Sequence, residues 1–158
     1  MLSGGGEATV WAPEAYQSRD LDFILGFWSS FGASKKPLLD LGFDEKGQVF
    51  RHPSTIFTVE FPKGPLAIGR DEVDEWETLV RGEMKLNILS ATDSVRGRLA
   101  WFLYENDFSG MNQAVGVALY NDVDLDLILA WCGRERATHK FAIFRENLEA
   151  RKAGSHGD

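Results

Sequence analysis

The sequence predicts an α/β (α+β) protein in which an α/β part over residues 1–89 precedes a helical part over residues 90–150. Two observations lead to this prediction. Short apolar runs bounded by glycine, proline and polar residues, typical of strands, fill most of the first part, and longer amphipathic segments fill the second. No glycine- or proline-rich linker separates the two parts. We therefore expect one compact unit, with a frayed tail at 151–158.

The composition is that of a globular protein of one domain. Hydrophobic residues make up 44% of the 158 residues, yet no apolar run approaches the ~20 residues that span a membrane. The formal net charge of −7 argues against general nucleic-acid binding, which needs a basic face. The single cysteine, Cys132, excludes an internal disulfide, so we expect a cytoplasmic protein. The tryptophan content allows a homodimer.

In the first part, turn residues separate the expected elements. Glu7–Trp11 is expected to form a short helix before Pro13, and Asp20–Leu25 a short strand. The run "KKPLLDLGF" predicts a helix that Pro37 opens and Gly42 closes. Further strands are expected at 48–50, 55–61, 66–68, 77–80 and 84–89.

Four helices are expected in the second part, at 90–105, 111–122, 124–136 and 139–151. The first would be capped by Thr92 or Asp93 and would end in a break at 106–110. The third would be capped by Asp122 or Asp124, which leaves the other aspartates of "DVDLDL" on the surface.

The residues that suggest metal and phosphate binding lie in the opening stretch "LSGGGEATVWAPEAYQSRDLDF". Because a strand alternates faces and rises about 3.3 Å per residue, Asp20 and Asp22 project from one face, while Leu21 and Phe23 face the core. Two carboxylates ~7 Å apart repel by about 2 kcal/mol at an effective dielectric near 20. Magnesium binds one or two carboxylates and completes its shell with substrate phosphates, so it would remove this repulsion.

The glycines fit an anion site, because free N–H groups at the start of a helix attract phosphate. In this interpretation Gly5 and Gly6 hold phosphates, Ser18 donates to a phosphate oxygen, and Asp20 and Asp22 hold the metal. An alternative stays open for the aspartate pair and another for the glycine run. A D-x-D pair on a solvent-facing strand is harmless, and glycines near a terminus often form a flexible lead-in.

The stretch "GGGEATVWAPEAYQSRDLDF" resembles the signature of nucleotidyltransferase-fold proteins: a glycine pair, a short helix, then Ser-x-Asp-x-Asp on a strand. "FTVEFPKGPLAIG" and "ATDSVRGRLAWF" resemble the small bacterial branch of uncharacterised or toxin–antitoxin-associated nucleotidyltransferases. The resemblance implies a mixed β-sheet flanked by helices and a metal, Mg²⁺ or Mn²⁺, held by three carboxylates. It also implies transfer of a nucleoside monophosphate from a nucleoside triphosphate to an unknown acceptor.

Carried over to this chain, the resemblance implies that Asp20 and Asp22 are catalytic metal ligands. It implies phosphate contacts at Gly5, Gly6 and Ser18, the same residues that the helix argument selects. Glu60 in "TVEF" best matches the third carboxylate, as a metal ligand or as the base that takes the proton of the acceptor. Its alternative is an ordinary outward strand residue.

Two departures from the family pattern favour a second function. Only Met1–Ser3 precede the glycine run here, and glycine stands where active members carry serine. The alternative is therefore a catalytically silent nucleotidyltransferase-like protein, an antitoxin or assembly partner that binds a protein encoded nearby.

Other chemistry-bearing residues give weaker signals. The three histidines are scattered, which argues against zinc, and Cys132 is expected to be a buried core thiol. Arg96 and Arg98 either pair with Asp93 or approach the site. The tryptophans are expected in the core or at an interface rather than as base-stacking platforms, because none lies in a basic patch: Trp11, Trp28, Trp76, Trp101 and Trp131.

Overall fold

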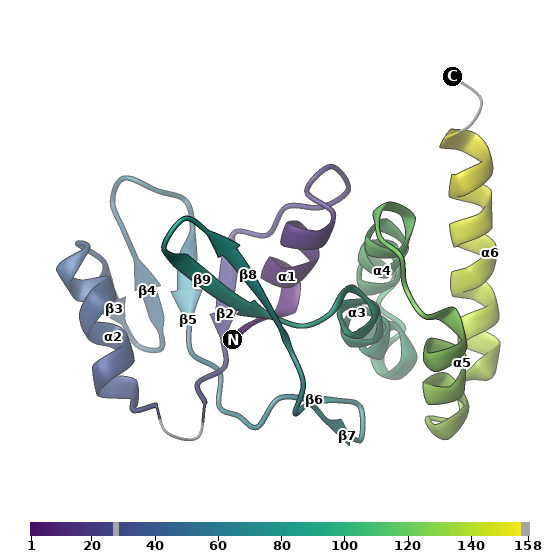
Figure 1. Cartoon of the computed structure of the whole chain (residues 1–158), viewed down its shortest axis with the longest axis horizontal. Helices are drawn as coiled ribbons and strands as arrows, with labels where there is room; N and C mark the ends of the chain where they lie inside the picture. The colour runs from purple at the N-terminus through teal and green to yellow at the C-terminus, as the bar shows by residue number, and fades with distance from the viewer. Residues whose placement is uncertain (27–28, 156–158) are drawn as a thin grey trace.

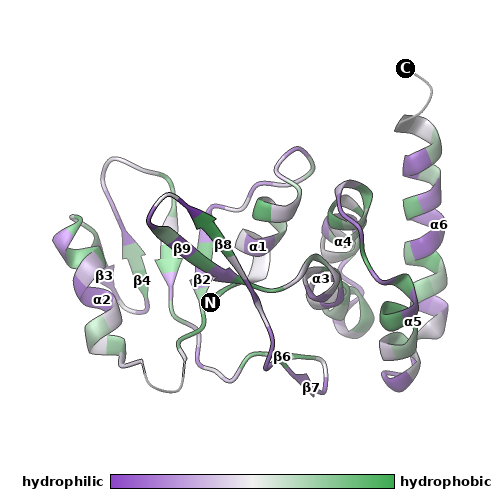
Figure 2. Cartoon of the chain, viewed as in Figure 1, coloured by the Kyte–Doolittle hydropathy of each residue, from purple (hydrophilic) through white to green (hydrophobic). Residues whose placement is uncertain are grey.

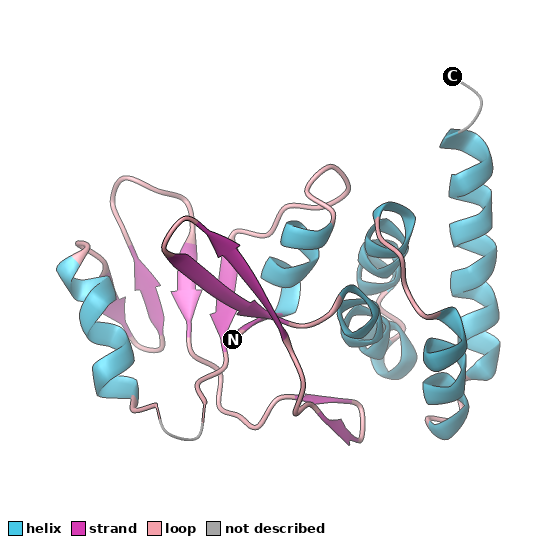
Figure 3. Ribbon diagram, viewed as in Figure 1, coloured by secondary structure: helices cyan, strands magenta, loops and turns pink. Residues whose placement is uncertain are grey.

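A computed structural model describes residues 1–26 and 29–155. Its strands gather in one half and four of its helices in the other, which confirms the mixed α+β class (Figure 3). The described strands are β1 (Leu2–Ser3), β2 (Asp20–Phe23), β3 (Asp44–Lys46), β4 (Val49–Arg51), β5 (Thr58–Glu60), β6 (Ala67–Ile68), β7 (Asp71–Glu72), β8 (Glu77–Arg81) and β9 (Met84–Ile88). The described helices are α1 (Gly4–Trp11), α2 (Phe31–Asp40), α3 (Ala91–Glu105), α4 (Phe108–Tyr120), α5 (Leu125–Arg134) and α6 (Thr138–Ser155).

The main sheet has the strand order β3-β4-β5-β2-β1-β9-β8 over the described residues (Figure 1). Strand β2 lies at its centre, parallel to β5 and antiparallel to β1. Strand β1 is also parallel to β9, with Leu2 as the register partner of Ile88. The sequence pattern does not predict this strand. It forms because its central place lets both of its edges pair, although it has only two residues.

Helix α1 begins at Gly4, three residues before the predicted start at Glu7. The prediction is wrong at this end because glycine has a low intrinsic helix propensity, which tertiary contacts override here. Ala8 and Ala12 are fully buried between the sheet and the helices α3 and α4, so α1 joins the two halves (Figure 1).

Helix α2 corrects the prediction that Pro37 opens a helix. Ser30 caps it by accepting a hydrogen bond from the N–H of Ala33, and Pro37 lies within it. The predicted end is confirmed. Gly42 has φ +92°, and Phe43 N donates to Leu38 O, the bond that closes a Schellman motif.

The helical half follows the predicted order with changes at its ends. Ser90, not Thr92 or Asp93, caps α3 by accepting from Asp93 N, and α4 begins earlier than predicted, at Phe108. Asp124 caps α5, as one of the two predicted alternatives. The expected frayed tail is helical as far as Ser155, and residues 156–158 lie outside the described residues.

The largest continuous core joins α1 to the helical half, and Trp131, Phe144 and Leu148 are fully buried in it. Hydrophilic and hydrophobic residues alternate along α6, one face of which packs on α4 and α5 (Figure 2). Cys132 is buried as predicted, and burial raises the pKa of its thiol to about 11. Trp28 lies outside the described residues, and none of the described helices is both long and apolar enough to cross a bilayer.

Helix α4 packs closely against the backbone of α3 at Gly110, and this contact yields a prediction. A Cβ at Gly110 would lie 2.7 Å from Arg98 O, whereas a Cβ at Gly133 on α5 would meet nothing within 4 Å. We expect Gly110→Ala to lower the free energy of unfolding by about 1–3 kcal/mol through overpacking. Gly133→Ala, the matched control, should raise it by up to about 1 kcal/mol through helix propensity.

Urea unfolding followed by circular dichroism measures both variants. Two changes of the same sign would contradict the close packing of α3 on α4.

Candidate functional site

The sheet places the three predicted carboxylates on two adjacent strands. In the parallel pairing of β2 with β5, Asp22 is the register partner of Glu60, and Asp20 is that of Thr58. Because register partners point to the same face, Asp20, Asp22 and Glu60 share the face opposite the buried Val59. Thr58 Oγ1 donates a hydrogen bond of 2.6 Å to Asp20 Oδ1.

The charges of this group act on one another. Burial, followed by Glu60 and Asp20, raises the pKa of the Asp22 carboxyl, while Arg98 acts in the opposite direction. The donor set consists of carboxylate oxygens, which suits a hard cation such as Mg²⁺ or Mn²⁺. In residues 1–26 and 29–155 no three acidic, histidine or cysteine side chains already converge as a metal site.

The N-terminus of α1 lies directly beside Asp22. Gly4 has φ +69°, and a Cβ there would lie 2.6 Å from Asp22 Oδ2, so any residue with a side chain would be strained at this position. The N-cap residue Ser3 makes no side-chain cap, and its hydroxyl instead lies 3.3 Å from Asp22 O, to which it donates. The N–H groups in the first turn of α1 therefore have no cap from the Ser3 side chain, and this turn lies next to the Asp22 carboxylate.

The other two glycines have packing roles. A Cβ at Gly5 would lie 2.9 Å from Ser18 Oγ, and a Cβ at Gly6 would lie 3.0 Å from Leu2 Cδ1. Ser18 Oγ donates to Asp20 O at 2.9 Å and accepts from Asp20 N at 3.2 Å. Ser18 thus fixes the start of β2 in the described chain, and the phosphate contacts of Gly5, Gly6 and Ser18 stay predictions.

A pocket of about 220 Å³, here called the α1 pocket, opens at this N-terminus. Its lining includes Ser3, Gly4, Glu7, Ile68, Arg98 and Trp101. Glu7 is 1% exposed, and its Oε2 has no hydrogen-bond partner among the described residues. Burial raises the pKa of Glu7 to about 8, against the opposing effect of Arg98. The buried Nε of Arg98 likewise lacks a partner in the described part of the chain.

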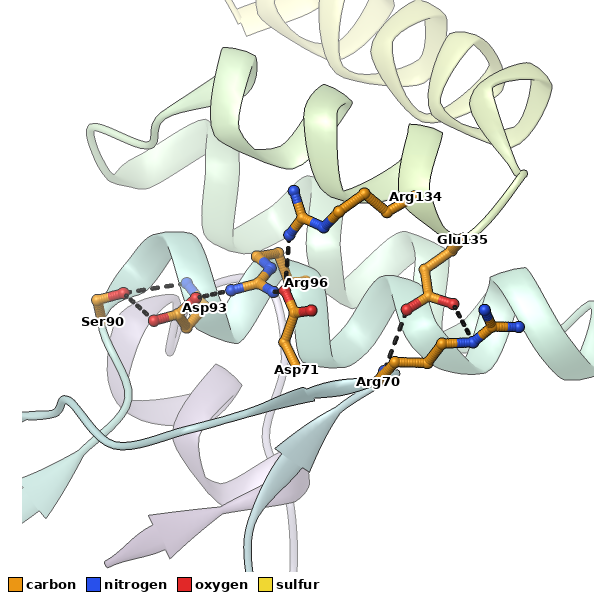
Figure 4. Close-up of polar contacts among 7 residues, drawn as sticks. All are labelled: Arg70, Asp71, Ser90, Asp93, Arg96, Arg134 and Glu135. Carbon is orange, nitrogen blue, oxygen red and sulfur yellow. Dashed lines mark hydrogen bonds and ion pairs between the residues drawn. The ribbon is translucent and has the colours of Figure 1, made fainter.

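The β6–β7 hairpin supplies one wall of the α1 pocket, and charged side chains fix it to the helices (Figure 4). Asp71 accepts hydrogen bonds from Arg96 of α3 and, at 2.7 Å, from Arg134 of α5. Arg96 also donates to Asp93 at 2.7 Å and lies over the ring of Trp131. This network orients the hairpin, because Arg96 is only 8% exposed and its partners come from three elements.

Sequence reasoning missed Gly4 and Glu7 and left Arg98 undecided. The structure shows a different alternative for each arginine. Arg96 pairs with Asp93, and Arg98 lines the α1 pocket. Glu7, which directly follows the glycines, was a detectable signal. An acidic residue is favourable in a first helical turn, and here it is also buried.

The burial of Glu7 predicts a pH-dependent stability. Its pKa in the folded protein, about 8, exceeds the unfolded value of 4.5, so between these values the folded state binds more protons. The free energy of unfolding should therefore fall as the pH rises from 5 to 8, by up to about 1.4 kcal/mol per pH unit from this group. Glu7→Gln cannot ionise, so its stability relative to the wild type should increase over that range.

Urea unfolding at pH 5, 6.5 and 8 tests this, with Glu149→Gln, an exposed site on α6, as the control. Parallel pH profiles for the wild type and Glu7→Gln would refute it.

The comparisons with known proteins do not assign this site to a family. No family model matches the chain, and no curated protein or solved structure matches it significantly. The resemblance to nucleotidyltransferases stays a prediction that rests on the residues of the opening stretch and on their positions.

Proposed function

We propose that this protein is a metal-dependent nucleotidyltransferase that moves a nucleoside monophosphate from a nucleoside triphosphate to an acceptor. One observation carries the proposal: the register pair Asp22 and Glu60 lies beside the uncapped N-terminus of α1, with Gly4 against the Asp22 carboxylate. A carboxylate pair and an anion-binding helix end are thus adjacent, as a metal-bound triphosphate requires.

Each group has a distinct part in this chemistry. A bound Mg²⁺ or Mn²⁺ would neutralise the triphosphate and align the attacking oxygen. Asp20, Asp22 and Glu60 would hold it, while the first-turn N–H groups of α1 and the Arg98 guanidinium would bind phosphate oxygens. The acceptor hydroxyl oxygen bonds to the α-phosphorus, and the bond from that phosphorus to the bridging oxygen breaks, so pyrophosphate leaves. Glu60, if free of the metal, would take the hydroxyl proton.

The proposal predicts nucleotide binding that needs both the metal and the carboxylates. We expect calorimetric titration with each nucleoside triphosphate to show binding in the presence of Mg²⁺ that is lost in Asp20→Asn/Asp22→Asn. The reason is that neutral amides are weak ligands for a hard cation. The double variant should stay folded, because removing two neighbouring like charges relieves repulsion.

The chain contains a matched control for this experiment. Asp122→Asn/Asp126→Asn changes two aspartates around the start of α5, away from the site, and should leave binding intact. Mg²⁺-dependent binding that survives Asp20→Asn/Asp22→Asn would sink the proposal. Absence of binding for all four nucleotides would instead favour the silent binding protein, whose complex with a partner chain should survive Asp22→Asn.

A further inference from the structure

Beyond the α1 pocket, α3 forms one side of a second and smaller pocket. This outer pocket has a volume of about 170 Å³ and is lined by Ala100, Trp101, Tyr104 and Glu105. Ala100 and Trp101 line both pockets, so the Trp101 side chain borders each of them. The α1 pocket lies at the N-terminus of α1 and the outer pocket lies on α3. These two helices pack against each other (Figure 1).

The two pockets offer different chemical groups. The α1 pocket offers Arg98, the helix N-terminus and the buried Glu7, whose Oε2 has no partner among the described residues. The outer pocket offers two aromatic rings, because Trp101 is 54% exposed and Tyr104 is 50% exposed. A ligand that matches both pockets carries an anionic group and a flat aromatic group.

The turn of the β6–β7 hairpin lies against Tyr104 of the outer pocket. Gly69 has φ +62°, and a Cβ there would lie 2.7 Å from the Tyr104 hydroxyl and 2.6 Å from Glu135 Oε1. Glu135 Oε1 in turn accepts from Arg70 N at 3.1 Å. The Tyr104 hydroxyl therefore lies close to Gly69 and Glu135, and Trp101 lies one turn earlier on α3, in the same outer pocket.

The sequence argues against base stacking by the tryptophans, but the structure leaves Trp101 exposed and places it in one pocket with Arg98. We propose that Trp101 is the stacking platform for the base of the nucleotide, at the outer end of a site whose phosphate end is the α1 pocket. This inference rests on the proposed function, and it assigns to this chain a preference for whole nucleotides over bare polyphosphate. Stacking on an aromatic ring accepts every base, because each base has a π-face. Selectivity among the four bases should consequently be low.

The test separates the base from the phosphates with two probes. The wild type and variants are titrated with Mg²⁺ and a nucleoside triphosphate, and then with Mg²⁺ and inorganic tripolyphosphate. We expect Trp101→Ala to weaken nucleotide binding by about tenfold or more and to leave tripolyphosphate binding unchanged. Trp101→Phe should retain most of the nucleotide affinity, since it keeps a ring at that position.

Two exposed aromatic residues serve as controls. Tyr120→Ala, on α4 and 53% exposed, should not change binding of either probe. Trp76→Ala tests the rival platform, because Trp76 lines a larger pocket of about 710 Å³ with Met1 and Ile24. Because Trp101, Tyr120 and Trp76 are exposed, their variants should keep the melting temperature of the wild type within a few degrees.

Each outcome has one meaning. A selective loss of nucleotide affinity in Trp101→Ala supports the proposal. Unchanged nucleotide affinity, an equal loss for both probes, or a loss in Trp76→Ala instead would overturn it and leave the nucleotidyltransferase proposal standing. A wild-type protein that binds neither probe would overturn both proposals together.

Discussion

The structure depends on the close approach of α1 to the sheet. Three consecutive glycines allow it, because a Cβ at Gly4, Gly5 or Gly6 would meet Asp22, Ser18 or Leu2 at 3.0 Å or less. Bare backbone therefore brings the helix end to the carboxylate strand, and the same contact places α1 between the sheet and α3. A larger residue at Gly4 would press against the Asp22 carboxylate and be strained at a positive φ, so the fold and the candidate site share one steric requirement.

The second constraint is the burial of charge around that contact. Glu7 and Arg98 lie in the α1 pocket with polar atoms that lack partners among the described residues, an arrangement that costs stability unless a ligand or a proton compensates. The hairpin network around Asp71 differs, because both terminal nitrogens of the buried Arg96 have carboxylate partners and only its Nε has none among the described residues. The contrast distinguishes a structural ion-pair network from a pocket that suits a ligand.

Local patterns predicted those parts of the fold that are decided locally. Alternation placed Asp20 and Asp22 on one face of β2, and cap chemistry located Gly42 and Asp124. Tertiary contacts decided the rest. The start of α1 opposes glycine's intrinsic propensity, β1 exists only through its neighbours, and Arg98 reaches the site because α3 packs on α1. The family resemblance selected Glu60 as the third carboxylate, but only the structure shows that Glu60 is the register partner of Asp22 and that Glu7 is buried.

The parallel pairing of β2 with β5 has a consequence for how the chain folds. It joins positions such as Asp20 and Thr58 that are 38 residues apart, whereas α3 and α4 are connected by a short link and can associate early. Loop closure delays distant contacts, so we expect the carboxylates to meet after α3 and α4 have associated. Their repulsion then opposes the closing of the β2–β5 pairing and not the association of α3 with α4. A divalent cation, bound as the proposed function requires, would offset this repulsion as the pairing closes.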